Sequence, residues 1–334
     1  MSPPLRTTLT LSLLLALLIG AIAWRLVIGG SGATAAQTAQ LMDLRLTRVL
    51  TGLTVGASLA VAGVLLQSLL RNPLASPDLL GLASGSGLGV MLAVYLAYQT
   101  TSDIASMGGI APSLAALVGA LAALAVVYLF SQRRGLLDPI TLILVGVVVS
   151  IMCSAGIALF RHLMPDQGLA ASRLLLGALR EDVSRQELAA VGGATLVCTL
   201  IGVWLGNAMD AAALGDDEAR SVGVPLGPLR AGLFLTSGVL TAGAVVLAGP
   251  IGFVGLICPH AVRMLAGPAH RPLVAGSAIA GATLVVTADA IVRLINIDSG
   301  RLPISILTSL ILSLIHISGP TRLRRISYAV FCLK

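Results

Sequence analysis

The sequence contains a single lysine, Lys334, although it carries 21 basic residues in all. A Walker A loop needs a lysine in its G-K-[ST] step, because that side chain reaches the β- and γ-phosphates of the nucleotide. No such lysine stands inside this chain, so a P-loop of its own is excluded. Charged residues are also scarce, at 10% of the 334 residues against about a quarter in soluble domains. Hydrophobic residues reach 57%, which predicts a membrane protein rather than a soluble enzyme.

Cysteine and histidine are few, with four of each. The cysteines are widely spaced and form no C-x-x-C pair, which argues against a disulfide framework. Cys258 and His260 lie two residues apart, but no second pair stands at ligand spacing, so we expect no metal site and no cofactor. The formal net charge is +7. Its arginines are isolated between apolar runs rather than gathered on a solvated face, so we expect no nucleic-acid partner.

Apolar runs long enough to cross a bilayer recur along the chain. About 20 consecutive apolar residues span the hydrocarbon core as a helix. Two weaker candidates, 251–265 and a run from Leu302, add to eight clear ones. The sequence therefore predicts an all-α polytopic membrane protein with about ten transmembrane helices embedded in the lipid bilayer. The clear spans are 9–28, 49–70, 79–98, 110–130, 140–160, 188–205, 229–247 and 273–295.

The two ends of the chain differ from the rest. Residues 1–28 combine Arg6, an apolar run and Ala21-x-Ala23, as a signal peptide does, but the run is long and we expect a retained first helix. Residues 1–310 form one predicted transmembrane domain. The stretch 311–334 contains Pro320 and three arginines, which predicts a truncated last helix and a tail that is not native to the domain.

Arginines set the orientation only weakly. With ten spans and an inner N-terminus, Arg6 and Arg220 are among the basic residues on the cytoplasmic side, as the positive-inside rule requires. Others, including Arg45, Arg48 and Arg293, fall at the outer ends of helices. Because outward basic residues oppose that rule, they indicate an acidic partner on the outer face.

Glycines recur at four-residue spacing within the spans, as in Gly52-x-x-x-Gly56 and Gly81-x-x-x-Gly85-x-x-x-Gly89. Small residues in this pattern let membrane helices approach one another closely. The glycine run that ends at Gly89 is not a dinucleotide-binding loop, because no strand precedes it. We therefore interpret these glycines as helix-packing positions.

Two of three segments that interrupt the apolar pattern are turns or surfaces on the predicted cytoplasmic side. The first, 71–81, reads RNPLASPDLLG; its prolines break a helix, and Asp78 is placed to cap the next one. The second, 207–225, is the longest polar stretch of the chain. Its acidic run 216–218 opens a short helix, where the helix dipole favours negative charge. The pattern fits either a solvated loop or a docking surface for a cytoplasmic protein.

The third segment, 249–263, reads GPIGFVGLICPHAVR. We expect Pro259 to break its helix, because proline removes a backbone donor and clashes with the preceding turn. His260 and Arg263 would then face the inner surface.

Together these segments resemble the FecCD family of ABC-transporter permeases, over residues from about 45 to about 310. The residues that carry the resemblance are Arg71, Asn72, Pro73, Pro77, Gly81, the Leu214–Gly223 stretch, Pro259, His260, Arg263, Asp289 and Arg293. The resemblance implies a non-catalytic permease subunit in the bacterial inner membrane, which pairs with a second permease subunit. A cytoplasmic ABC ATPase dimer would power it, and an extracytoplasmic solute-binding protein would deliver the cargo.

The resemblance also implies roles for individual residues. The stretch between the sixth and seventh helices contacts the ATPase in this family, which here indicates Leu214, Gly215, Asp216, Ala219, Arg220 and Gly223. Outward arginines of the family meet glutamates of the binding protein, which here indicates Arg45, Arg48 and Arg293. Thr47 and Arg301 depart from the family pattern, which has a proline and an acidic residue there. For Arg293, an ion pair with Asp289 one turn earlier is a structural alternative.

The translocation pathway is expected to be lined by small and weakly polar side chains of the second to fifth helices. Candidates are Gly56, Ser58, Gln67, Ser84, Ser86 and Ser150. Gln67 either lines the pathway or bonds another helix, because intramembrane polar groups face protein or cavity. The expected cargo is a ferric siderophore, with cobalamin and haem as alternatives.

Two other classes of membrane protein fit less well. An ion-coupled secondary transporter needs midplane carboxylates, and Asp289 is the only well-embedded acid. An intramembrane hydrolase needs histidines within spans, and the four here lie at helix ends or in loops.

Overall fold

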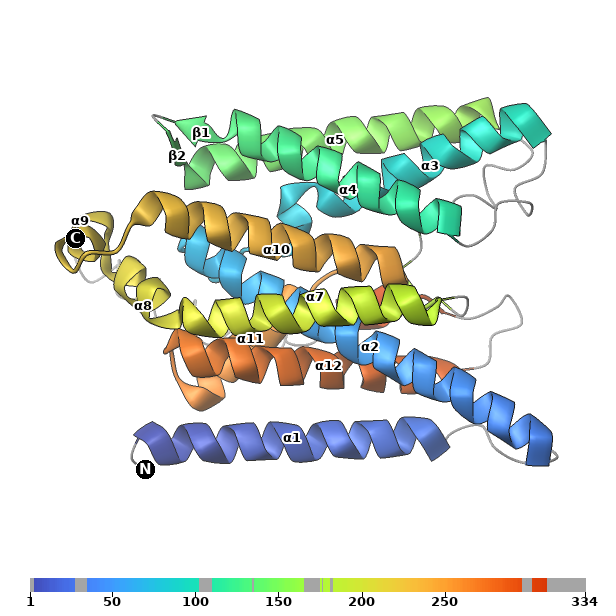
Figure 1. Cartoon of the computed structure of the whole chain (residues 1–334), viewed down its shortest axis with the longest axis horizontal. Coiled ribbons are helices and arrows are strands. Elements are labelled where there is room, and N and C mark those ends of the chain that lie inside the picture. Colours follow the sequence, from blue (N-terminus) through green and yellow to red (C-terminus); the bar gives the residue numbers. More distant parts are fainter. Residues whose placement is uncertain are drawn as a thin grey trace, which may run out of the picture.

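In the computed structural model the chain is a bundle of long helices that run side by side (Figure 1). The structure describes residues 3–27, 35–101, 110–133, 135–164, 175, 177–180, 183–295 and 302–310. Within these ranges eight helices are long and apolar enough to cross a membrane, which confirms the eight clear predicted spans. They are α1 (Pro3–Val27), α2 (Ala35–Leu70), α3 (Leu82–Thr101), α4 (Ile110–Phe130), α5 (Pro139–Leu163), α7 (Arg185–Trp204), α10 (Leu226–Ala248) and α12 (His270–Leu294).

Shorter elements connect these helices. The weak span at 251–265 corresponds to a helix of 13 residues. The last predicted span begins with helical residues 304–310, while its predicted truncation and the tail 311–334 lie outside the described residues. The short elements are η1 (Pro77–Leu80), β1 (Gln132–Arg133), β2 (Leu136–Leu137), α8 (Gly206–Leu214), α9 (Asp216–Ser221) and α11 (Val254–Ala266).

Local sequence explains where two of the long helices begin. Asp138 caps α5: its carboxylate accepts the Thr141 backbone N–H at 2.9 Å, and proline occupies the first helical position. Helix α7 begins with a capping box, in which the Ser184 hydroxyl and the Glu187 carboxylate each accept the other's backbone N–H. Both caps satisfy donors that a helix start otherwise leaves unpaired.

Helix α2 starts at Ala35, well before the predicted start at residue 49. The charged residues that interrupt the apolar run there have hydrogen-bond partners in the fold. Asp43 pairs with Arg185 at 2.8 Å, and Arg45 donates to the Leu26 carbonyl oxygen at 2.9 Å. Charge in the sequence therefore masked the first part of this helix.

Helix α2 crosses the middle of the bundle and packs against α12, α10, α11 and α7 (Figure 1). At its crossing with α12, Gly56 and Gly281 bring the two backbones together. A Cβ on either glycine would overlap the carbonyl oxygen of the other. The α3–α4 pair is built the same way around Gly85 and Gly119. The glycine spacing thus serves close helix packing, as predicted.

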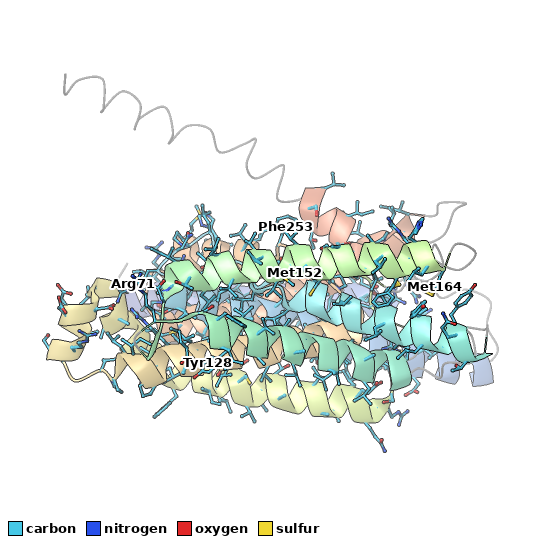
Figure 2. All side chains as sticks on the ribbon, turned by 90° about the horizontal axis from the view of Figure 1, so that it is seen from above. Arg71, Tyr128, Met152, Met164 and Phe253 are labelled. Carbon is cyan, nitrogen blue, oxygen red and sulfur yellow. The ribbon has the colours of Figure 1, made fainter. Side chains whose placement is uncertain are left out.

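One end of the bundle carries the N-terminus, β1, β2, α8 and α9 (Figure 1). Figure 2 shows Arg71 at this same end and Met164 at the opposite one. The helix ends that the sequence assigns to the cytoplasm, those of Arg6 and Arg220, therefore share one side. The outer ends of α1, α2 and α12 gather at the other side.

Candidate functional site: a coupling surface and an arginine cluster

Helices α8 and α9 present an exposed surface at one end of the bundle (Figure 1). Leu214 is 77% exposed and Val222 is 68% exposed, so both present apolar surface to the outside. Asp217 and Arg220 stand out beside them, with side chains 95% and 57% exposed. Apolar contacts rimmed by charge are typical of a protein-docking surface.

Two small residues hold α9 against the body of the protein. Ala219 is fully buried, so α9 lies on its alanine side and leaves Asp217, Glu218 and Arg220 exposed. Gly215 adopts φ +154°, where a side chain is strained, and a Cβ there would overlap the Glu218 carboxylate. Of the predicted coupling residues, Leu214 and Arg220 therefore face out, while Gly215 and Ala219 set the position of the helix.

Asp216 joins α9 to two other elements. Its carboxylate accepts from Arg230 of α10 through both oxygens, each at 2.9 Å, and also from Arg71 at the end of α2. Arg230 in turn donates to the Leu137 carbonyl oxygen of β2 at 3.4 Å. Burial raises the pKa of Asp216, but Arg230 and Arg71 outweigh that effect and the pKa is lowered from 3.8.

The segment after Arg71 is folded tightly. Arg71 itself has φ +49°, a left-handed conformation that is uncommon outside glycine. The predicted cap by Asp78 is wrong: its carboxylate accepts the Ser76 hydroxyl at 2.9 Å and the backbone N–H of Phe253, which precedes α11 (Figure 2). Burial raises the pKa of Asp78. Asp78 thus ties η1 to the start of α11 instead of opening α3.

Pro259 does not break its helix, contrary to the prediction. Helix α11 continues through Pro259, which lacks the N–H that would bond the carbonyl oxygen of Gly255 four residues earlier. That oxygen instead accepts the Gln67 side-chain amide at 3.2 Å. The Gln67 oxygen accepts from Arg263 at 3.1 Å, and the amide also donates to the Ala75 carbonyl oxygen at 3.3 Å. Of the two alternatives for Gln67, the structure shows the bond to another helix.

The other pathway candidates are packed within the described part of the bundle. Gly56 lies at the α2–α12 crossing, and Ser58 shares a hydrogen bond of 2.7 Å with Thr195. Ser86 is buried, and Ser84 is half-buried. Ser150 donates to the Gly146 carbonyl oxygen at 2.9 Å within its own helix. Their place in a pathway wall stays a prediction.

At the opposite end, Asp289 of α12 is the centre of an arginine cluster. Its Oδ2 accepts from Arg25 Nε at 2.5 Å, and its Oδ1 accepts from Arg48 Nε at 2.9 Å. In the described part of the chain these are the ion pairs of Asp289, and the alternative pair with Arg293 is not among them. Arg293 lies within electrostatic range of Arg25, Arg45, Arg48 and Asp289. The predicted docking arginines are therefore brought together, but Arg48 is 7% exposed and faces inward.

Arg25 is a member of this cluster that the sequence did not reveal. It lies near the end of the first span, where the apolar run suggests lipid contact, and its side chain is fully buried. The outward arginine excess was the one available signal. Arg25 was left out because a sequence does not show which face of a helix meets a neighbour.

The family model of the FecCD transport family matches residues 8–317. The chain belongs to this family. It is 33% identical over 271 residues to the hemin transport system permease HmuU of Yersinia pestis, covering 81% of this chain and 79% of that protein. It is 38% identical over 281 residues to the vitamin B12 import permease BtuC of Serratia proteamaculans, covering 82% and 79%.

A solved structure of a metal-chelate type ABC transporter in an inward-facing conformation superposes on this fold with a TM-score of 0.80. The two chains are 31% identical, and the match covers 94% of this chain and 99% of the other. The chain is therefore a permease of a FecCD-type ABC importer, a multi-pass bacterial membrane protein that is not itself catalytic.

Proposed function

We propose that this FecCD permease imports a ferric siderophore. The family assignment and the metal-chelate type of the matched structure support a chelated metal as cargo. The relatives named above transport hemin and vitamin B12, which are also large metal chelates, and haem and cobalamin are the alternative cargoes. Uptake into proteoliposomes that contain the complete importer, measured with each of the three cargoes, tests the choice. Uptake of haem or cobalamin without uptake of a ferric siderophore would overturn it.

The permease itself performs no chemical step in this proposal. It supplies outward-open and inward-open states of a pathway, ATP binding in a partner biases one of them, and docking of a binding protein biases the other. A second permease subunit, identical or related, completes the pathway. An ion-coupled secondary transporter is the competing proposal, and uptake that continues without the ATPase would favour it.

The surface of α8 and α9 is the proposed contact for the ATPase dimer. The observation that supports it most is the combination of exposed Leu214 and Arg220 with a buried Ala219, because it leaves a small apolar and charged face held rigidly at one end of the bundle. Hydrophobic contacts rimmed by charges suit a partner that must bind and transmit motion.

An Arg220→Glu substitution tests this contact. Copurification of the ATPase with the permease is expected to fall at least tenfold, because the new charge meets a surface selected for the opposite sign. Arg185→Glu is the matched control, since Arg185 is 80% exposed in its side chain but lies at the start of α7, at the other end of the bundle. Equal loss in both variants, or in neither, would contradict the contact.

The outer arginines Arg45, Arg48 and Arg293 are the proposed docking site for the acidic surface of a solute-binding protein. The cluster around Asp289 supports this proposal, because in the described part of the chain it gathers these three arginines with Arg25 at the end opposite α9. Combined charge reversal, Arg45→Glu with Arg48→Glu, is expected to abolish docking to permease in nanodiscs, and the wild-type affinity should fall steeply with salt. Docking that is unchanged in this variant would remove the assignment.

A further inference from the structure

Helix α8 lies against the start of α12, at the end of the bundle that carries α9 (Figure 1). A Cβ on Gly206, the first residue of α8, would come within 2.4 Å of Cγ and 3.0 Å of the backbone nitrogen of Arg271. A side chain at Gly206 would therefore push the two helices apart. One turn later, Met209 is fully buried in the hydrophobic core that also contains Leu273 of α12. Close packing of this kind leaves α8 little freedom to shift without α12.

A polar contact joins the same two helices. The Oδ1 atom of Asp210 accepts the backbone N–H of His270 at 3.1 Å and lies 2.6 Å from Nδ1 of the same residue. A carboxylate only accepts hydrogen bonds, so Nδ1 carries the hydrogen in this pair. His270 is the first residue of α12, and Ala269 before it makes no side-chain cap. Asp210 therefore caps α12 from another helix and satisfies a donor that a helix start leaves unpaired.

The Asp210–His270 pair is partly shielded from solvent. The His270 side chain is 10% exposed and the Asp210 side chain is 41% exposed. Because hydrogen bonds depend on direction as well as distance, the pair fixes how α8 is turned about its own axis. Packing through Met209 stabilises the contact between the helices, and Asp210 sets its geometry.

Helix α12 carries this contact into the middle of the bundle. It has 25 residues and is therefore about 38 Å long. Near its midpoint, Gly281 meets Gly56 of α2 so closely that a Cβ on Gly56 would lie 2.1 Å from the Gly281 carbonyl oxygen. The two backbones are in direct contact there, so a shift of α12 is passed to α2 rather than taken up by a flexible side chain.

We propose that α12 receives the motion of the ATPase through α8, with Asp210 and His270 as the positioning residues of this link. This inference rests on the proposed function, which puts the ATPase against α8 and α9. Helix α9 is connected differently, because Asp216 ties it to Arg230 of α10 and to Arg71 at the end of α2. Motion at the docking surface therefore enters the bundle at two places, and α8 delivers it to α12.

Asp210→Ala breaks the link, because it removes the acceptor for both hydrogen bonds of His270. Amide exchange in the first turn of α12 should become about tenfold faster, the factor expected when a hydrogen bond to a charged group is lost. Asp43→Ala is the matched control. It also removes a carboxylate that pairs with a basic side chain, that of Arg185, but at the other end of the bundle.

The motion of α12 is measured in the complete permease–ATPase complex in nanodiscs. Nitroxide labels are placed on cysteines that replace Ala269, just before α12, and Ile140, at the start of α5, both of which are exposed. Trapping with ATP and vanadate should change the distance between the labels in the wild type and in Asp43→Ala. The distance should stay unchanged in Asp210→Ala. All comparisons are made between complexes with the same ATPase content.

Two substitutions of His270 separate the hydrogen bond from the packing. His270→Asn places a side-chain N–H near the position of Nδ1 and should keep the change in label distance. His270→Leu fills similar space without a donor and should lose most of that change. Equal behaviour of the two variants would mean that packing alone carries the motion, and the roles of Asp210 and His270 would be wrong.

The proposal is overturned if trapping leaves the label distance unchanged in the wild type, or if Asp210→Ala changes it as the wild type does. The second result, together with a lower unfolding temperature of Asp210→Ala, would show that Asp210 only stabilises the fold. Failure of the ATPase contact itself is distinct, since Arg220→Glu would then keep its ATPase. If Arg220→Glu loses the ATPase while Asp210→Ala moves α12 normally, the link through α8 alone is wrong.

Discussion

Asp216→Asn should uncouple α9 from the rest of the permease while leaving the fold intact. The substitution keeps the shape of the side chain but removes the charge that Arg230 and Arg71 share. Arg230 is 12% exposed in its side chain and Asp216 is 34% exposed, so these pairs are partly shielded from solvent. Hydrogen bonds to charged groups contribute about 1.5–3 kcal/mol when shielded, and exposed ion pairs about 0.2–1 kcal/mol. We expect a loss of about 2 kcal/mol, which is roughly a thirtyfold weaker attachment of α9.

The assay compares ATP hydrolysis and cargo uptake by the same reconstituted importer. With α9 loosely attached, the ATPase still binds and hydrolyses ATP, but its motion is transmitted poorly, so uptake per ATP should fall severalfold. Asp43→Asn is the control, since it makes the same chemical change in an exposed ion pair at the other end of the bundle, where the side chain is 53% exposed. If Asp216→Asn and Asp43→Asn give the same uptake per ATP, Asp216 does not carry the coupling.

Three further predictions concern the helix contacts and the titration of Asp216. Gly56→Val should lower the unfolding free energy of the detergent-solubilised protein by about 1–3 kcal/mol through overpacking against Gly281. Gly20→Val is the control, because a Cβ at Gly20 has no neighbour within 4 Å and should change the unfolding free energy little. Equal effects of the two substitutions would contradict close packing of α2 against α12 at Gly56. Gln67→Leu should cost about 1–3 kcal/mol by stranding the Gly255 and Ala75 carbonyl oxygens. Gln99→Leu, whose only described side-chain partner is the Tyr95 hydroxyl, serves as its control by thermal unfolding. Because Arg230 and Arg71 lower the pKa of Asp216 in the folded protein, the stability that Asp216 gives to the attachment of α9 should be complete above pH 3.8 and should be lost as the pH falls through this lowered pKa. Amide exchange in α9 should show this pH step in the wild type and lack it in Asp216→Asn.

The sequence predicted the long helices well because their signal is strong and local. A bilayer demands about 20 apolar residues per helix, and eight runs of that kind stand out. The segments around Arg71, Gly215 and Pro259 were also recognisable, since prolines, glycines and an acidic run interrupt the apolar pattern there. Asp216 and Arg71 were both singled out, but only the fold shows that they contact each other.

Other features could not be predicted because they depend on partners far away in the chain. The first turns of α2 look polar in sequence, yet Arg48 is satisfied by Asp289, which lies 241 residues later. Pro259 looks like a helix breaker in sequence, because it leaves the Gly255 carbonyl oxygen without its backbone donor. Gln67, 188 residues before Gly255, donates a hydrogen bond to that oxygen instead. In both cases the local rule was overridden by a tertiary hydrogen bond that satisfies the group in question.

The continuous α11 with Pro259 inside it has a mechanical consequence. Since no backbone hydrogen bond can join residues 255 and 259, a tilt of the helix at this point breaks one backbone hydrogen bond fewer than a tilt elsewhere along it. The side-chain amide of Gln67 bonds the helix at this point. The same side chain also donates to the Ala75 carbonyl oxygen and accepts a hydrogen bond from Arg263. A rotation of that amide would break its hydrogen bonds to Gly255, to Ala75 in the loop after α2 and to Arg263 in the second half of α11 at the same time. The rigidity of α11 at Pro259 therefore depends on one side chain, Gln67, rather than on the backbone alone.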